Sequence, residues 1–285
     1  MVGHTQLKLR MAVVGSILFG FYLAVAWFVF QAFGGGAATI GLLSLGTIVY
    51  PFVLYKFGKW SAVRGVGAED MPEQADGRRR YGEIHQRTEQ LCREMDIKKP
   101  RLMVAEMGVP NAFAVGRKGD GTVVVSSELI NLLGMDELEG VIAHELAHIK
   151  NRDTVVMIMG QAIAAMVGWV VYLVVMFRGE RGSFLVAWLG SMVAQTIVTV
   201  FLMAISRYRE YVADEDAAQY TRNPDAMARA LEKISQGAQG KEMRGESNVS
   251  ALCIFGGDRG LLATVFATHP PTEKRIERLR SQTAY

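Results

Sequence analysis

Two histidines and a glutamate occupy one short run of the chain, VIAHELAHIKNRD at residues 141–153. Side chains four residues apart on a helix project from nearly the same face, so His144 and His148 can present their imidazoles to a single ion. Their nitrogens can reach zinc at about 2.0 to 2.1 Å. Glu145 would point its carboxylate beside the ion, where a base is needed to take a proton from an activated water. The H-E-x-x-H pattern therefore indicates a catalytic zinc site, and the alternative is a solvated amphipathic helix.

A zinc ion held by two histidines needs a third protein ligand, because catalytic sites usually supply three and keep a fourth position for water. His4, His85 and His269 are candidates by residue type. His4 lies in the N-terminal tail, and the amphipathic helical pattern around His85 favours a surface position for it. Glu210 is the more attractive candidate, because it follows the last long apolar run and a hairpin of the apolar runs would return it to the side of His144. His269 remains the alternative.

Long uncharged runs account for the 50% hydrophobic content of this 285-residue chain. Residues 11–55 carry no charge and are long enough for two membrane spans of about 20 residues each, with Gly34 to Gly36 at the turn. A cleaved signal peptide would have a shorter apolar region, so this run is interpreted as a retained anchor. The runs at 154–177 and 183–206 predict two further membrane segments, with a buried hairpin inside a protein core as the alternative.

Lysines and arginines near the ends of the predicted spans indicate their orientation, because such residues tend to stay on the cytoplasmic side. Lys8 and Arg10 precede the first span, and Lys56, Lys59 and Arg64 follow the second. The two arginines of the RGERG loop between the later runs go against this rule. We expect a multi-pass protein of the cell (inner, cytoplasmic) membrane whose polar parts both face the cytoplasm and form one domain.

The polar parts combine helical patterns with a few short apolar pieces. RLMVA, NAFAVG and GTVVVSS are separated by Gly, Pro, Asn and Asp, which is typical of a small antiparallel sheet. Asp136 can cap the helix that follows, with Glu139 three residues on in a variant of the capping box. The predicted fold is mainly α with a small antiparallel β-sheet.

The chain is expected to have four parts. They are an N-terminal membrane anchor of two transmembrane helices at 1–58, a first catalytic part with the H-E-x-x-H helix at 59–153, a transmembrane or membrane-inserted hairpin at 154–206, and a second catalytic part with the third ligand at 207–285.

The chain also resembles a known family, the HtpX-type membrane zinc metalloproteases, which are related to the CAAX prenyl proteases. Two leading apolar segments, NAFAVG, HELAH, a hydrophobic hairpin, REYVAD and HPPTEKRIERL appear in the family's order over nearly the whole chain. The resemblance implies a gluzincin-like protease domain, interrupted by the hairpin, in which His144, His148 and Glu210 bind one Zn²⁺ per chain and Glu145 is the general base. Asp214, in the E-x-x-A-D pattern, would orient a ligand imidazole, with a salt bridge to Arg207 or Arg209 as the alternative.

Two further motifs of the family resemble substrate contacts. Asn111, Ala112, Phe113 and Ala114 resemble a strand at the edge of the active site, along which an extended peptide can pair. Asn111 could instead simply end a turn. His269 could stabilise the oxyanion of the transition state, and its alternative is a place at the entry of a helix.

These features predict a membrane-bound zinc metalloendopeptidase of class EC 3.4.24. Glu145 would take a proton from the activated water and deliver it to the leaving amine. The expected substrates are misfolded or damaged membrane proteins, cut on the cytoplasmic side in protein quality control and the stress response. The alternatives are a processing protease for a defined, for example prenylated, peptide and a zinc-binding membrane scaffold without hydrolysis. A net charge of +3 is too small to indicate a nucleic-acid partner, and the sequence leaves the oligomeric state open.

Overall fold

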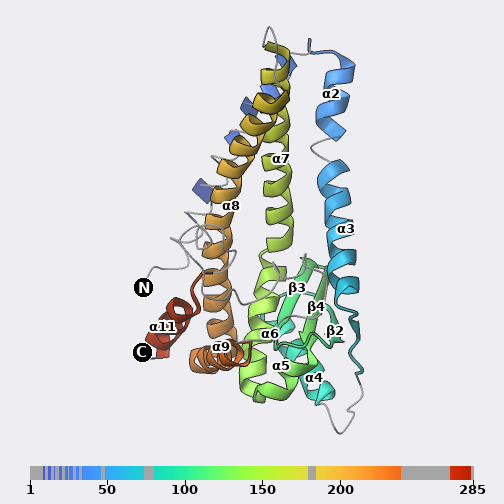
Figure 1. The fold of residues 1–285 in the computed structure, drawn as a ribbon. Helices are drawn as coiled ribbons and strands as arrows, with labels where there is room; N and C mark the ends of the chain where they lie inside the picture. The colour runs from blue at the N-terminus through green and yellow to red at the C-terminus, as the bar shows by residue number, and fades with distance from the viewer. Residues whose placement is uncertain are drawn as a thin grey trace. The chain divides into compact units, whose positions relative to one another are not determined.

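The computed structural model is mostly helical and contains one small sheet (Figure 1). It describes residues 34–45, 49–73, 80–178, 184–238 and 270–283, together with scattered positions between 9 and 31. The chain divides into two compact units. The apolar unit comprises Met1–Lys56 and Val156–Tyr208, and the sheet unit comprises Phe57–Val155 and Arg209–Tyr285.

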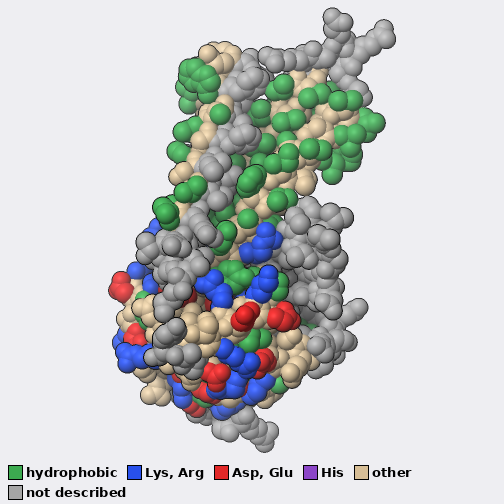
Figure 2. All heavy atoms as spheres, turned by 90° about the vertical axis from the view of Figure 1, so that its left-hand side faces the viewer, with side chains coloured by type: hydrophobic (Ala, Val, Ile, Leu, Met, Phe, Trp, Pro, Cys, Tyr) green, Lys and Arg blue, Asp and Glu red, His purple; other side chains and the backbone are tan. Residues whose placement is uncertain are grey.

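Two long helices carry the later apolar runs, α7 (Asp153–Arg178) and α8 (Phe184–Thr221). Both are long and apolar enough to cross a membrane. Many of their large hydrophobic side chains are exposed, as Trp169 is at 65%, and Figure 2 shows hydrophobic side chains gathered over the apolar unit. The faces that meet each other form a buried cluster of Ala164, Val167, Val198, Leu202 and Ile205. An apolar surface of this kind fits a membrane protein.

The N-terminal pair of predicted spans is only partly described. The first of them is described only at scattered positions. The second is represented by α2 (Ala37–Ser44) and the beginning of α3 (Tyr50–Gly65). The two N-terminal transmembrane helices therefore stay a prediction.

The sheet unit contains one mixed sheet. Its strands are β1 (Glu69–Asp70), β2 (Arg101–Ala105), β3 (Ala112–Arg117) and β4 (Asp120–Ser126), in the order β1-β2-β4-β3. The β1–β2 and β3–β4 pairs are antiparallel, but β2 and β4 run parallel. The predicted strand segments are thus found as strands, whereas the prediction of an antiparallel sheet is wrong for the central pair.

The parallel pair arises because β3 does not lie beside the strand that precedes it. Residues 106–111 reverse the direction of the chain and place β3 at the edge of the sheet, and β4 then returns between β2 and β3. Val123, Val124 and Val125 of β4 are fully buried, as expected for a central strand covered on both faces. Alternation of apolar residues predicts strands but not which strands are neighbours, so the sequence could not reveal this order.

Helices cover the sheet and build the core of the sheet unit. They are α4 (Tyr81–Glu94), α5 (Ser127–Leu132), α6 (Met135–Lys150), α9 (Pro224–Ala238) and α11 (Thr272–Thr283). Helix α6 is the central one, because it contacts β3, β4, α4 and α9. A Cβ atom on Gly140 would lie 3.3 Å from the Met227 backbone, so α6 and α9 approach each other closely at this point.

Helix α6 begins two residues earlier than the capping pattern predicts. Its N-cap is Gly134, whose N–H donates to Glu137 Oε2 at 2.8 Å. Lys233 of α9 donates to the same oxygen at 2.7 Å. The predicted cap of Asp136 with Glu139 is therefore wrong, and Glu139 instead accepts a hydrogen bond from Arg87 of α4.

Gly116 of β3 provides a test of the β3–β4 hairpin. Its φ is +113°, and a Cβ atom there would lie 2.2 Å from the carbonyl oxygen of Asp120. Gly116→Ala should therefore lower the free energy of unfolding by about 2 to 4 kcal/mol. Gly119→Ala is the matched control, because Gly119 also has a positive φ, +88°, but no atom within 4 Å of the added methyl group. We expect a cost of about 1 kcal/mol for the control.

The measurement is thermal unfolding of the full chain in detergent. An equal loss of stability in the two variants would contradict the close approach of Gly116 to Asp120.

Candidate metal centre

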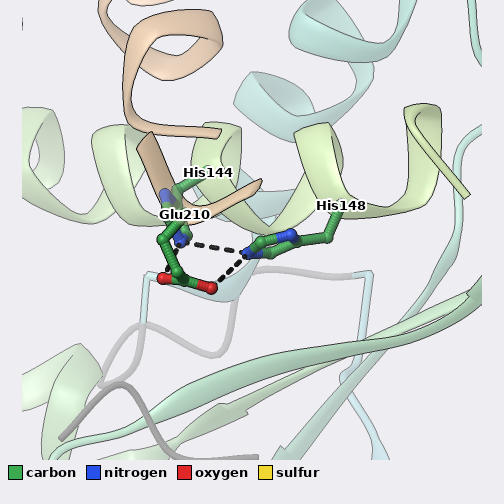
Figure 3. Close-up of side chains that lie close together, drawn as sticks. All are labelled: His144, His148 and Glu210. Carbon is green, nitrogen blue, oxygen red and sulfur yellow. Dashed lines mark hydrogen bonds and ion pairs between the residues drawn. The ribbon is translucent and has the colours of Figure 1, made fainter. Parts of the chain in front are cut away.

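Three of the predicted side chains come together in the sheet unit. His144 and His148 extend from α6 and Glu210 from α8, and Figure 3 shows them pointing toward one another. The two Nε2 atoms lie 3.2 Å apart. Glu210 Oε2 lies 3.5 Å from His144 Nε2, and Glu210 Oε1 lies 3.4 Å from His148 Nε2. The His144 side chain is 1% exposed and that of Glu210 is 5% exposed, while that of His148 is 17% exposed.

The spacing of these atoms fits a tetrahedral zinc ion. Ligand atoms at 2.0 to 2.1 Å from zinc lie about 3.3 Å from one another in a tetrahedron. The two Nε2 atoms lie 3.2 Å apart, and they lie 3.5 and 3.4 Å from different oxygens of Glu210. One donor atom from each residue lies within 4.8 Å of the other two. Two imidazole nitrogens and one carboxylate oxygen are also a donor set that zinc uses in catalytic sites, with the fourth position left for water. The residues present therefore fit this metal.

The second ring nitrogen of His144, Nδ1, lies close to a carboxylate. Asp214, one helical turn after Glu210 on α8, has its Oδ1 3.0 Å from His144 Nδ1. Burial alone would lower the pKa of His144, but the carboxylates of Asp214 and Glu210 outweigh burial and raise it. Asp214 is thus placed to fix the ring so that Nε2 faces Glu210 and His148.

Arg275 of α11 is a member of this cluster that the sequence analysis did not single out. It is fully buried, and it donates two hydrogen bonds to Asp214, from Nε at 2.8 Å and from Nη2 at 2.7 Å. Its Nη1 also lies 3.4 Å from Glu210 Oε2. Burial would lower the pKa of Arg275, but the charge of Asp214 dominates and raises it, so the guanidinium stays charged. The sequence does contain one signal for this position, because Leu279 follows Arg275 by four residues and so lies on the same face of the helix. In the structure both residues are fully buried.

His148 has a carboxylate partner of its own. Its Nδ1 lies 2.6 Å from Oδ2 of Asp153, the first residue of α7, which the sequence analysis also did not single out. Burial would lower the pKa of His148, but Glu210 and the charge of Glu145 raise it. Glu145 itself is buried beside His144 in α6, at 3% exposure.

The NAFA segment lies at the beginning of the edge strand. Asn111 is buried, its N–H donates to Ser126 Oγ at 3.0 Å, and its carbonyl accepts from the Ser126 N–H at 2.8 Å. Ala112 and Phe113 are buried in β3, and Ala114 is partly buried. Among the strands that the structure describes, β3 has a neighbour on one side only, and α6 packs against it.

Of the other three candidate histidines, only His85 is described, and it is not part of the cluster. His4 and His269 lie outside the described residues. His85 is buried at 8% exposure, so the predicted surface position is wrong. The carbonyl of Met71 accepts a hydrogen bond from His85 Nε2 at 3.0 Å, because the segment after β1 covers this face of α4.

Comparison with known proteins gives consistent matches. Residues 78–283 match the model of "Peptidase family M48". A "Protease HtpX homolog" of Halobacterium salinarum is 50% identical over 95% of this chain and 100% of that protein. One of Pyrococcus abyssi is 39% identical over 78% of this chain and 77% of that protein. The crystal structure of S. mikatae Ste24p has the same fold with a TM-score of 0.57 at 14% identity, over 96% of this chain and 66% of the other.

Replacement of Arg275 tests whether its guanidinium group stabilises the Asp214 carboxylate. Arg275→Met leaves a buried carboxylate without its partner, so we expect the free energy of unfolding to fall by about 3 to 5 kcal/mol. Lys274→Met is the matched control, because Lys274 precedes Arg275 on α11 and is exposed. That control should stay within about 0.5 kcal/mol.

Thermal unfolding of metal-free protein in detergent measures both variants. Similar melting temperatures for the two would show that Asp214 does not depend on Arg275.

Proposed function

The chain belongs to peptidase family M48, and we propose that it is a membrane-bound zinc-dependent endopeptidase of the HtpX type, in class EC 3.4.24. The observation that carries the proposal is the convergence of His144, His148 and Glu210, whose donor atoms lie within 4.8 Å of one another, with the buried Glu145 next to the first of them. One Zn²⁺ per chain would be held by these three residues.

A zinc ion bound there acidifies a water molecule and polarises the scissile carbonyl of the substrate. The chain's own residues supply the remaining chemistry. Glu145 accepts the proton of the attacking water and delivers it to the leaving amine. Asp214 orients His144 through Nδ1, and Arg275 keeps Asp214 ionised and in place. The nucleophile is water, so the chain needs no nucleophilic side chain.

The edge strand is the proposed place for the substrate backbone. Extended peptides bind an open sheet edge through main-chain hydrogen bonds, and β3 lies at the edge of the described sheet and contacts α6. Asn111 to Ala114 would then align the substrate along the helix that carries Glu145. His269 is proposed to contact the oxyanion of the transition state.

The substrates are polypeptides, and we propose misfolded or damaged membrane proteins, in protein quality control and the stress response. Two apolar helices long enough to span a membrane support this class, because they would anchor the chain in the membrane. The positive residues flanking the predicted spans favour a protease domain in the cytoplasm and a multi-pass position in the cell membrane. We retain the division into an anchor at 1–58, catalytic parts at 59–153 and 207–285, and a membrane hairpin at 154–206.

Glu145→Gln separates hydrolysis from metal binding. The amide cannot accept the proton of water, so cleavage should slow by a factor on the order of 10² to 10⁴. Zinc content should stay the same, because Glu145 is not one of the three converging ligands. His144→Ala should lose both zinc and activity.

Metal analysis and cleavage of an unfolded membrane protein are measured on the same preparations in detergent. Unmodified cleavage by zinc-loaded Glu145→Gln would refute the mechanism. If the unsubstituted chain cuts a prenylated peptide at one bond and leaves unfolded membrane proteins intact, the processing protease replaces the quality-control enzyme. Zinc binding without cleavage of any peptide would identify a scaffold.

A further inference from the structure

Each of the two histidines has its own carboxylate and its own buried arginine. The His148 set consists of Asp153, with Oδ2 2.6 Å from His148 Nδ1, and Arg209, with Nη2 2.6 Å from the other oxygen, Oδ1. The side chains of Arg209 and Asp153 are only 4% and 9% exposed. We propose that Asp153 and Arg209 are positioning residues that hold His148 ready to bind the metal, an inference that rests on the zinc site proposed above.

The backbone is arranged to bring Asp153 to this place. Helix α6 ends at Lys150, and α7 begins at Asp153, only five residues after His148. Between them Arg152 has a φ of +57°, in the left-handed region that non-glycine residues rarely adopt. The sharp turn returns the first residue of α7 to the last turn of α6.

The contact of Asp153 decides which nitrogen of His148 is available. The Asp153 carboxylate accepts a hydrogen bond from Nδ1–H, and the neutral ring then has its lone pair on Nε2. That Nε2 is the atom that lies 3.2 Å from His144 Nε2 and 3.4 Å from Glu210 Oε1. Without Asp153 the ring could carry its proton on Nε2 or rotate, and either change removes a metal-ligand atom from the cluster.

Arg209 gives the buried Asp153 carboxylate a charged partner, with Nη2 2.6 Å from Oδ1. All three side-chain nitrogens of Arg209 are buried without a hydrogen-bond partner in the described structure, and Nη2 makes only the ion-pair contact with Asp153. Leaving such donors buried and unsatisfied costs stability, so stability alone does not account for Arg209. Its position directly before Glu210 places a ligand and the support of another ligand on the same turn of α8.

The two carboxylates differ in the number of contacts that they make with their arginines. Asp214 receives two hydrogen bonds from Arg275, whereas Asp153 has one ion-pair contact with Arg209. His148 is also the more exposed ligand, at 17% against 1% for His144. The Asp153 contact is therefore the main restraint on the ligand that solvent reaches most easily.

The test uses the full chain in detergent with Glu145→Gln as the parent, so that self-cleavage does not interfere. Zinc affinity is measured by competition with a chromophoric chelator. Asp153→Ala should raise the zinc Kd about 10- to 100-fold. Asp153→Asn should have a smaller effect, because the amide oxygen can still accept from Nδ1.

Arg209 is tested in the same assay. Arg209→Met should raise the Kd about tenfold, and Arg209→Lys, which keeps the charge, should restore most of the affinity. The double variant Asp153→Asn with Arg209→Met should have a zinc Kd no higher than that of the single variant with the higher Kd, because the two residues act through one contact.

Asp216→Asn is the matched control. Asp216 is a buried aspartate of α8 at 2% exposure that accepts a hydrogen bond from Asn151. Its replacement should lower the melting temperature but leave the zinc Kd unchanged. With cobalt in place of zinc, the visible absorption spectrum should change in Asp153→Ala and stay that of the parent in Asp216→Asn.

The outcomes separate the two proposals. If Asp153→Ala loses thermal stability but keeps the parent's zinc Kd and cobalt spectrum, Asp153 has only a structural role and the positioning proposal is wrong. If the parent chain binds no zinc, the zinc site itself is wrong, and the role of Asp153 and Arg209 is overturned together with it.

Discussion

The approach of Glu210 on α8 to the two imidazoles of α6 is the contact on which the rest of the site depends. Residues 144 and 210 are far apart in the sequence, yet their donor atoms lie 3.5 Å apart. Since Asp214 follows Glu210 by one turn, the same approach that brings a ligand to the site also brings the carboxylate behind His144. One helix thus delivers two functions, and a shift of α8 would remove both.

Electrostatics explains why this contact is made in a buried place. Four carboxylates and two guanidinium groups surround the imidazoles, which leaves an excess of two negative charges (−4 + 2 = −2) when the rings are neutral. They are Glu145, Asp153, Glu210, Asp214, Arg209 and Arg275, all buried. A divalent cation balances this excess, and in its absence the raised pKa values of His144 and His148 have the same physical origin. This charge balance supports the metal site proposed above.

The sequence predicts those parts of the site that local geometry determines. The i, i+4 spacing of His144 and His148 needs only a helix, and Glu210 needs in addition that the apolar runs fold back as a hairpin. Asp153 lies only five residues from its partner, but its contact depends on the left-handed turn at Arg152, which no residue preference indicates. Arg275 contacts Asp214 across 61 positions, so only tertiary structure could reveal the pair. The parallel pairing of β2 with β4 was missed for the same reason, since strand patterns carry no information on strand order.

The unbroken course of α8 from Phe184 to Thr221 has a consequence for insertions and deletions. Each residue of an α-helix turns the next by about 100° and advances it by about 1.5 Å. One residue added or removed within α8 ahead of Glu210 would turn Glu210 and Asp214 away from α6 together. A change of length in the segment between α7 and α8 imposes no such rotation. Natural variation in chain length should therefore collect in that connecting segment and be rare in the last apolar turns of α8.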